Sequence, residues 1–104
     1  MNYETLRKQN TEKILQENLD FKNAIQEEDP DYIVDHAYEI VYKDEICCLF
    51  EILKFSEEAH IYLASLSSIL DTLYYAWMKC DANSFESLEY CIEDFLKEKA
   101  QSTK

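Results

Sequence analysis

The chain has 104 residues, of which 47% are apolar, and a formal net charge of −12, with no glycine and a single proline. This length suits one domain with one hydrophobic core, and the apolar content excludes a chain that is disordered throughout. Because tight β-turns depend on glycine, a β-sandwich or barrel would be hard to connect. The composition therefore predicts an all-α fold, a compact bundle of four or five helices in a single domain, residues 1–104.

The first helix is expected from about residue 2 to residue 27. Its apolar face is sparse, and residues 7–13 are polar on every side of the helix. The first half, residues 1–13, is therefore open to three interpretations: it is solvated, frayed, or used in a contact with a partner. The apolar face consists of Leu6, Ile14, Leu15, Leu19, Phe21 and Ile25.

Asp29 and Pro30 mark the next boundary, because aspartate is a good N-cap and proline suits the first position of a helix. A second helix is expected over residues 30–43, and a third over residues 45–54 with Asp44 as its N-cap. The two segments are so close that they could instead form one bent helix. The third segment is apolar on nearly every side, which predicts a place in the centre of the bundle.

A fourth helix is expected over residues 57–80, where apolar residues recur at spacings of three and four. A fifth helix is expected over residues 84–99, opened by a capping box of Asn83 and Glu86. The last residues, 100–104, are expected to form a disordered tail. Because the links between these segments are short, neighbouring helices should be antiparallel.

Acidic residues are concentrated in the middle of the chain. Of the 22 aspartates and glutamates, eleven lie between Glu27 and Glu58, where the bases are Lys43 and Lys54, so this segment contributes −9. The segment before it is neutral, and the segment after it contributes −3. A field of this sign repels nucleic acid and anionic membranes and attracts basic protein surfaces. We therefore expect a basic protein partner and no direct binding to nucleic acid or membrane.

Three of these acids, Asp31, Asp35 and Glu39, are spaced four residues apart and share one face of the second helix. The helical wheel places this face opposite an apolar stripe that runs from Val34 to Val41. Two interpretations remain: a solvated face that keeps the protein soluble, or an interface in which acids accompany tyrosines. In the second interpretation, the predicted partner-binding residues are Asp31, Tyr32, Asp35, His36, Glu39, Tyr42, Asp44 and Glu45.

One acidic stripe is too sparse to imitate DNA. Carboxylates four residues apart lie about 6 Å apart along a helix, whereas each DNA strand carries one charge per ~3.4 Å. The charge density would approach that of a nucleic acid only if acids from neighbouring helix ends gathered on the same side of the bundle.

The residues that could support catalysis or bind a metal are few. Glu57 and His60 form one Glu-x-x-His pair, but the second copy that a di-iron bundle needs is missing, and no Cys-x-x-Cys pair suggests zinc. His36 and His60 have no glycine-shaped nucleophile elbow beside them, and a chain without glycine cannot form a phosphate-binding loop. We therefore expect a protein that is not an enzyme and uses no metal and no cofactor.

The cysteines and the apolar runs bear on the compartment. Cys47, Cys48, Cys80 and Cys91 show no disulfide spacing, which predicts reduced thiols. No apolar run reaches the ~18–20 residues needed to cross a bilayer, and the start of the chain lacks the pattern of a secretory signal. These observations predict a cytoplasmic protein.

The run YIVDHAYEI at residues 32–40, followed by KDEI at residues 43–46, resembles a family of small, acidic, all-helical uncharacterised proteins of gut Firmicutes and their phages and mobile elements. The resemblance centres on His36-Ala37-Tyr38-Glu39 and covers about fifteen residues. It implies no activity. It does imply an accessory protein of a mobile element, where small acidic proteins often inhibit the nucleic-acid-binding machinery of the host, CRISPR inhibitors among them.

Two functional hypotheses remain. In the first, the chain is a non-enzymatic acidic module that binds a basic protein, and its sharpest form is an inhibitor that blocks the basic groove of a nucleic-acid-binding protein. In the second, it is a structural or assembly protein that forms homo-oligomers through the first half of the first helix, Ile61 or Tyr75. The sequence does not decide between them.

Overall fold

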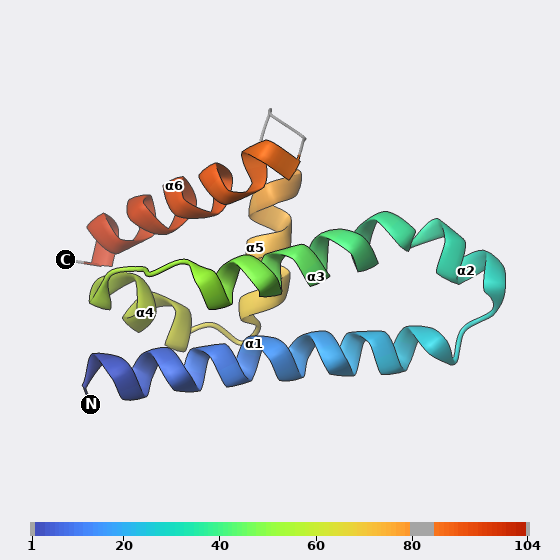
Figure 1. Cartoon of the computed structure of the whole chain (residues 1–104), viewed down its shortest axis with the longest axis horizontal. Helices are drawn as coiled ribbons and strands as arrows, with labels where there is room; N and C mark the ends of the chain where they lie inside the picture. Colours follow the sequence, from blue (N-terminus) through green and yellow to red (C-terminus); the bar gives the residue numbers. More distant parts are fainter. Residues whose placement is uncertain (1, 80–84, 104) are drawn as a thin grey trace.

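The computed structural model describes residues 2–79 and 85–103, and all regular structure in these ranges is α-helical (Figure 1). The all-α prediction is confirmed, although the described chain forms six helices rather than four or five. They are α1 (Tyr3–Gln26), α2 (Pro30–Asp35), α3 (Ala37–Ile52), α4 (Glu57–Ala64), α5 (Ile69–Met78) and α6 (Phe85–Thr103).

The two long arms of the molecule are α1 and the pair α2–α3, which doubles back beside α1 along the 44 Å long axis (Figure 1). α5 crosses both arms and contacts α1, α3 and α6, while α4 packs between α1 and α6. In residues 2–79 and 85–103, no helix combines the length and the apolar character that a membrane span requires.

Side-chain caps explain where the helices begin. Asn2, Asp29, Ser56 and Ser68 each accept a hydrogen bond from the backbone N–H three residues later, which satisfies one of the free donors at a helix start. Pro30 occupies the first turn of α2, where its missing N–H costs nothing. The predicted boundary at residues 29 and 30 is therefore confirmed.

The boundary between the predicted second and third helices was misplaced. The chain bends at His36, and α3 then continues without a break through Lys43 and Asp44. These two residues do not end a helix because their side chains are engaged elsewhere: Lys43 pairs with two carboxylates, and Asp44 pairs with Lys22. Of the two alternatives, a single bent helix is nearer to the structure, with its bend at His36.

The predicted helix over residues 57–80 is in fact two helices, α4 and α5, separated by residues 65–68. The Ser65 hydroxyl donates to the Tyr62 carbonyl at 2.6 Å, and Ser68 caps α5. Such local bonds compete with helical hydrogen bonds. The apolar periodicity hides this break because Leu66, inside it, still packs against the core.

The C-terminal helix is longer than predicted. α6 continues to Thr103, so residues 100–103 of the predicted disordered tail are helical. Ala100 explains the extension, because it is 7% exposed and belongs to the core. Asn83 of the predicted capping box, residue 80 at the end of the predicted fourth helix, and residue 104 lie outside the described residues.

The core lies where α5 crosses the two arms. Trp77 is fully buried and stacks on Tyr42, with ring centroids 5.2 Å apart. Its Nε1 donates to the hydroxyl oxygen of Tyr38 at 3.2 Å. These contacts draw one face of α3 inward. The fully buried apolar residues around them include Ile14, Ile46, Leu63, Ile69, Leu73 and Leu88.

The polar first half of α1 packs one face against the rest of the molecule, while Glu4, Gln9 and Glu12 are exposed. Asn10 is 2% exposed, and its Nδ2 donates both to His60 Nδ1 and to the His60 carbonyl, each at 3.0 Å. Leu6 and Ile14 are buried one turn to either side, and the Tyr3 hydroxyl donates to the carbonyl of Phe55. Of the three interpretations of this half, fraying therefore does not describe it, and solvation describes its outer face alone.

Candidate protein-binding surface on helices α2 and α3

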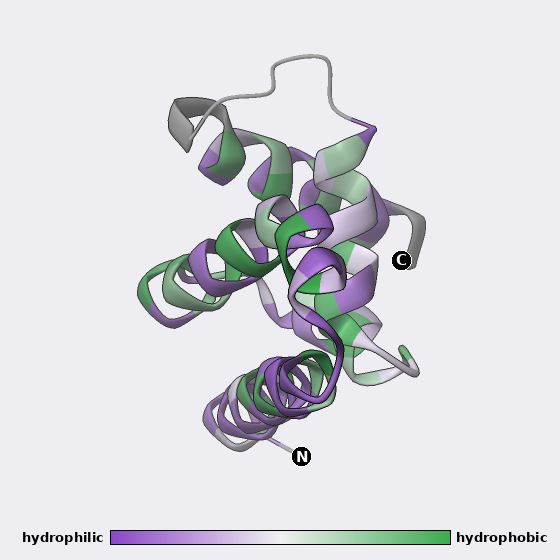
Figure 2. Cartoon of the chain, turned by 90° about the vertical axis from the view of Figure 1, so that its right-hand side faces the viewer, coloured by the Kyte–Doolittle hydropathy of each residue, from purple (hydrophilic) through white to green (hydrophobic). Residues whose placement is uncertain are grey.

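Four of the eight predicted partner-binding residues lie together at the end of the molecule where α1 connects to α2 (Figure 1). Asp31, Tyr32 and Asp35 are exposed, and the His36 ring stacks on Tyr32 with centroids 4.1 Å apart. Figure 2 looks onto this end, where hydrophilic and hydrophobic residues lie side by side. We name its carboxylates the acidic tip: Glu27, Glu28, Asp29, Asp31 and Asp35.

The other four predicted residues do not join this group. Glu39 Oε2 pairs with Lys43 Nζ at 2.8 Å, and Asp44 pairs with a lysine of α1 at 2.7 Å. Tyr42 is buried in the core, where desolvation raises the pKa of its hydroxyl. Glu45 is half-buried on the side of α3. The structure therefore divides the predicted set into four residues at the tip and four that are ion-paired or at least partly buried on α3.

Lys43 is the charged centre of the inner face of α3. Its Nζ lies 2.9 Å from Asp71 Oδ1 and 3.9 Å from the centroid of the Phe21 ring, so it joins α3 to α5 and α1. Burial alone would lower the pKa of Lys43, but hydrogen bonds to Glu39 and Asp71 outweigh it and raise the pKa. The ammonium therefore stays charged and holds three helices together.

The helical wheel predicted the exposure of the acids of α2 correctly, but it misassigned the apolar stripe and the face of α3 that carries Tyr42. Val34 is 71% exposed and Val41 is 48% exposed, whereas Tyr42, on the face expected to meet solvent, is 8% exposed. The core buries the Tyr42 face because that face continues along α3 into Ile46 and Phe50, which extends the apolar contact over several turns. The stripe from Val34 to Val41 is left in solvent.

A row of apolar residues follows this solvent face along α2 and α3. Its members are spaced by three, four or seven residues, which is the heptad spacing at which one helix presents an edge to another. Glu45 occupies the remaining heptad position, and Ile52 at the far end is 72% exposed. We name this row the α3 seam: Val34, Tyr38, Val41, Cys48 and Ile52.

α3 is apolar on two faces, and the described chain covers only one of them. Its inner face packs against α1 and α5, so the prediction that this helix lies in the centre of the bundle is wrong. A helix that is apolar all round is normally buried, and contiguous exposed apolar surface marks an interaction site. The sequence signal for this seam was that residues 45–54 are apolar on nearly every side of the helix. From the sequence, that signal was interpreted as burial within the chain.

The eleven acids of the middle segment are spread along the molecule. The five of the acidic tip lie at the α2 end, and Glu51, Glu57 and Glu58 lie near α4 at the opposite end (Figure 1). Among residues 2–79 and 85–103, no carboxylate of the tip takes part in an ion pair. The negative charge of the tip is therefore not neutralised by an ion pair with a described residue.

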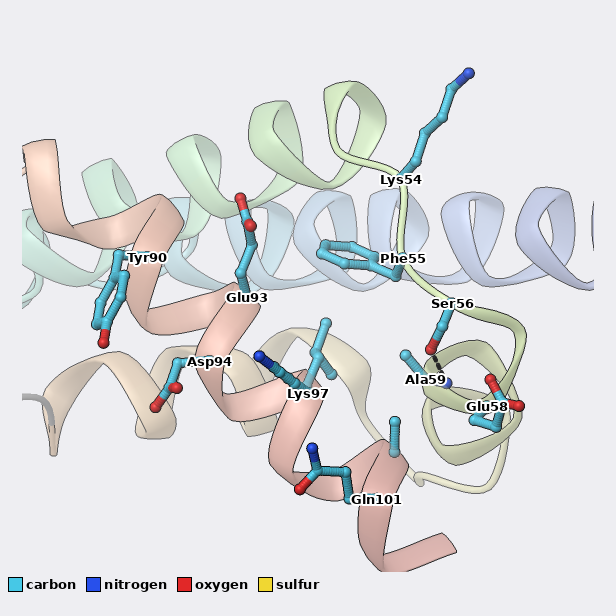
Figure 3. A pocket seen from close by; sticks show the side chains of 12 residues that line it. Lys54, Phe55, Ser56, Glu58, Ala59, Tyr90, Glu93, Asp94, Lys97 and Gln101 are labelled. Atoms are coloured by element: carbon cyan, nitrogen blue, oxygen red, sulfur yellow. Dashed lines mark hydrogen bonds between the residues drawn. The ribbon is translucent and has the colours of Figure 1, made fainter. Parts of the chain in front are cut away.

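A groove of about 620 Å³ lies between α6 and the link from α3 to α4 (Figure 3). Phe55 and Leu96 contribute apolar surface to it, and Tyr90, 68% exposed, lies at its edge. Burial, and then a hydrogen bond with Glu89, raises the pKa of Glu93 on its rim. Charges of both signs alternate around the groove, so it has no clear preference for a charged partner: Lys54, Glu58, Glu93, Asp94 and Lys97.

The two members of the predicted Glu-x-x-His pair differ in burial, because Glu57 is exposed and His60 packs in the core. His60 is 1% exposed, its Nδ1 accepts from Asn10, and its Nε2 is buried without a hydrogen-bond partner. Desolvation, and then the nearby Arg7 charge, lowers the pKa of His60 and keeps the ring neutral. In the part of the chain that the structure describes, no three histidine, cysteine or acidic side chains converge as a metal site would require.

The cysteines differ in state. Cys47 is buried, and desolvation followed by the charge of Asp44 raises the pKa of its thiol to about 12, so it is inert. Cys48 is exposed and free in the α3 seam. Cys91 is disulfide-bonded, which corrects the expectation that all four cysteines are reduced.

Comparison with known proteins gives no identity: no protein-family model, no curated protein and no solved structure matches this chain.

Proposed function

We propose that this chain is a non-enzymatic protein-binding module that binds a basic protein through α2 and α3. The observation that carries the proposal is the position of the α3 seam beside the acidic tip. An apolar patch rimmed by charged residues has the composition of a protein interface. The unpaired carboxylates of the tip would steer a cationic partner toward it.

The sharpest form of the proposal is a cytoplasmic inhibitor, carried by a mobile element, that occupies the basic groove of a nucleic-acid-binding protein. The net charge of −12 and the resemblance at residues 32–46 support this form. The spread of the acids along 44 Å favours a local contact by the tip over imitation of a long stretch of nucleic acid.

The test is affinity capture from a gut Firmicute lysate, at low salt, with three immobilised proteins. They are the wild type, the tip variant Asp31→Lys/Asp35→Lys, and the control variant Glu4→Lys/Glu12→Lys, whose two exposed acids lie on α1. Both variants change the net charge by the same amount. We expect the wild type and the control to retain the same basic protein and the tip variant to lose it.

Two results would contradict the proposal. Equal capture by the tip variant and the control would mean that charge at the tip does not direct binding. A captured complex that survives a gradient to about 1 M salt in the wild type would also count against it, because exposed charges are screened beyond ~3 Å at that salt.

A homo-oligomer is the second candidate function, and the same seam favours it, because an uncovered apolar face can pair with its own copy. The contact residues would then be those of the seam rather than the first half of α1, whose inner face is buried. Sedimentation equilibrium of the purified chain distinguishes the two: a stable dimer that Val41→Asp dissociates favours the homo-oligomer.

A further inference from the structure

We infer that the α3 seam is the docking site for an amphipathic helix of the partner, apolar along one edge and carrying lysine or arginine on both sides of that edge. The inference rests on the proposed function, because it names the element by which the basic partner binds. It specifies the secondary structure of the partner's binding element and its alignment with the seam, which the preference for a basic partner leaves undefined.

The spacing of the seam selects a helix as the occupant. From Tyr38 to Ile52 the seam positions, with the half-buried Glu45 among them, recur at three and four residues over about 21 Å of uninterrupted helix. At this spacing the side chains of a second helix can insert between those of the first. Val34 extends the row past the bend at His36, where the backbone hydrogen bond from Ile40 N to His36 O continues the helical path.

Charge complementarity selects a basic helix. Asp35 and Glu51 are exposed on either side of the seam, and Glu45 lies within it between Val41 and Cys48. A lysine or arginine beside the apolar edge of the partner would meet each of these carboxylates. In coiled coils, residues at the equivalent flanking positions set the choice of partner.

The same carboxylates disfavour a second copy of this chain. In an antiparallel pairing, the two kinds of seam position face each other, so that Glu45 would lie against Val41 of the second copy. In a parallel pairing, Glu45 would face its own equivalent. Each arrangement places a carboxylate against an apolar residue or a like charge, and both are costly. A basic helix avoids both.

The test uses a synthetic helical peptide of three heptads. Each heptad has leucine at its two seam-facing positions and lysine at the two positions that flank them, which makes four lysines for each pair of heptads. The flanking lysines repel one another and keep the peptide from pairing with itself. A scrambled isomer has the same composition and charge without the heptad order. Fluorescence anisotropy of each labelled peptide against the purified chain gives the dissociation constants.

We expect the heptad peptide to bind at least about tenfold more tightly than the scrambled isomer, since a few central apolar residues usually dominate an interface. Val41→Asp and Ile52→Asp should each remove that advantage. Both substitutions make the chain more acidic, so a loss of affinity for a lysine-rich peptide cannot come from charge. The matched control is Ile61→Asp, which changes a 47% exposed isoleucine of α4 outside the seam and should leave the affinity unchanged.

Each other outcome overturns the inference in a recognisable way. Equal binding of the two peptides would mean that charge alone attracts them, which would overturn helix docking. The proposed binding to a basic protein would then be decided by the capture experiment. Absence of binding by both peptides would overturn helix docking as well. A dimer of the free chain that Val41→Asp dissociates would make a second copy the occupant. Circular dichroism of each variant verifies that the fold is intact.

Discussion

α1 and α3 lie side by side, and they reverse the usual relation between polarity and burial. α1 has a sparse apolar face, yet its first half is closely bound to the rest of the molecule. α3 is apolar on nearly every side, yet one of its faces meets solvent. The difference teaches that the number of apolar residues in a helix does not tell how much of it the chain buries.

α1 binds its neighbours through polar side chains that reach the backbone of residues 51–70. Arg7 donates to the Glu51 carbonyl, Lys13 donates to the Leu66 carbonyl, and the Glu17 carboxylate accepts from the N–H groups that open α5. Backbone groups at helix ends and links need such partners. These three polar residues of α1 therefore contribute to packing, although the composition of the helix is that of a solvated one.

The largest effect should come from the inner face of α3. Ile46 is fully buried in the core, so Ile46→Ala should lower the free energy of unfolding by about 3–4 kcal/mol through lost apolar contact and a cavity. Urea unfolding followed by circular dichroism measures the loss. A cost under about 1 kcal/mol would mean that this face is not part of the core.

The next effect tests the polar packing of α1. Asn10→Ala removes both hydrogen bonds to His60 and leaves the buried His60 Nδ1 without its donor, at an expected cost of about 2 kcal/mol. Gln9, its exposed neighbour, is the control, and Gln9→Ala should change stability by no more than about 0.5 kcal/mol. Equal costs for the two variants would remove the distinction between the inner and outer faces of α1.

His60, the partner of Asn10, should make the free energy of unfolding depend on pH. Burial, and then Arg7, lowers the pKa of His60 in the folded chain, while the unfolded chain keeps an ordinary value near 6.5. The unfolded state therefore takes up a proton first, so this contribution to stability is complete above pH 6.5 and is lost as the pH falls below it. Replacing His60 by glutamine should flatten the fall in unfolding free energy between pH 7.5 and 5.5.

The wild type provides the comparison for that measurement. The carboxylates contribute their own pH dependence to every variant, so the informative quantity is the difference in slope. A wild-type slope in the His60→Gln variant would contradict a neutral, buried His60.

The sequence was sufficient for the fold class and for the boundary at Pro30, because missing glycine and a capping aspartate act locally. It was insufficient for the break at residues 65–68, because Leu66 in this serine-rich link maintains the spacing of apolar residues expected of one continuous helix. It was also insufficient for the faces of α3, since that choice depends on how Trp77 of α5 packs on Tyr42. Of the candidate site, the tip residues Asp31, Tyr32 and Asp35 were predictable, and the seam was not.

The smallest effect should come from the outer face of α3, where Ile52→Ala forms a matched pair with the change at Ile46. Both substitutions remove the same atoms from the same helix, but Ile52 is 72% exposed. We expect its unfolding free energy to change by no more than about 0.5 kcal/mol, because surface substitutions remove little buried area. A cost near that of the Ile46 variant would mean that the free chain already covers the seam, and no uncovered face would remain to select a partner. A negligible cost would mean that this isoleucine contributes little to folding, which is the expected behaviour of a side chain whose apolar surface is reserved for binding.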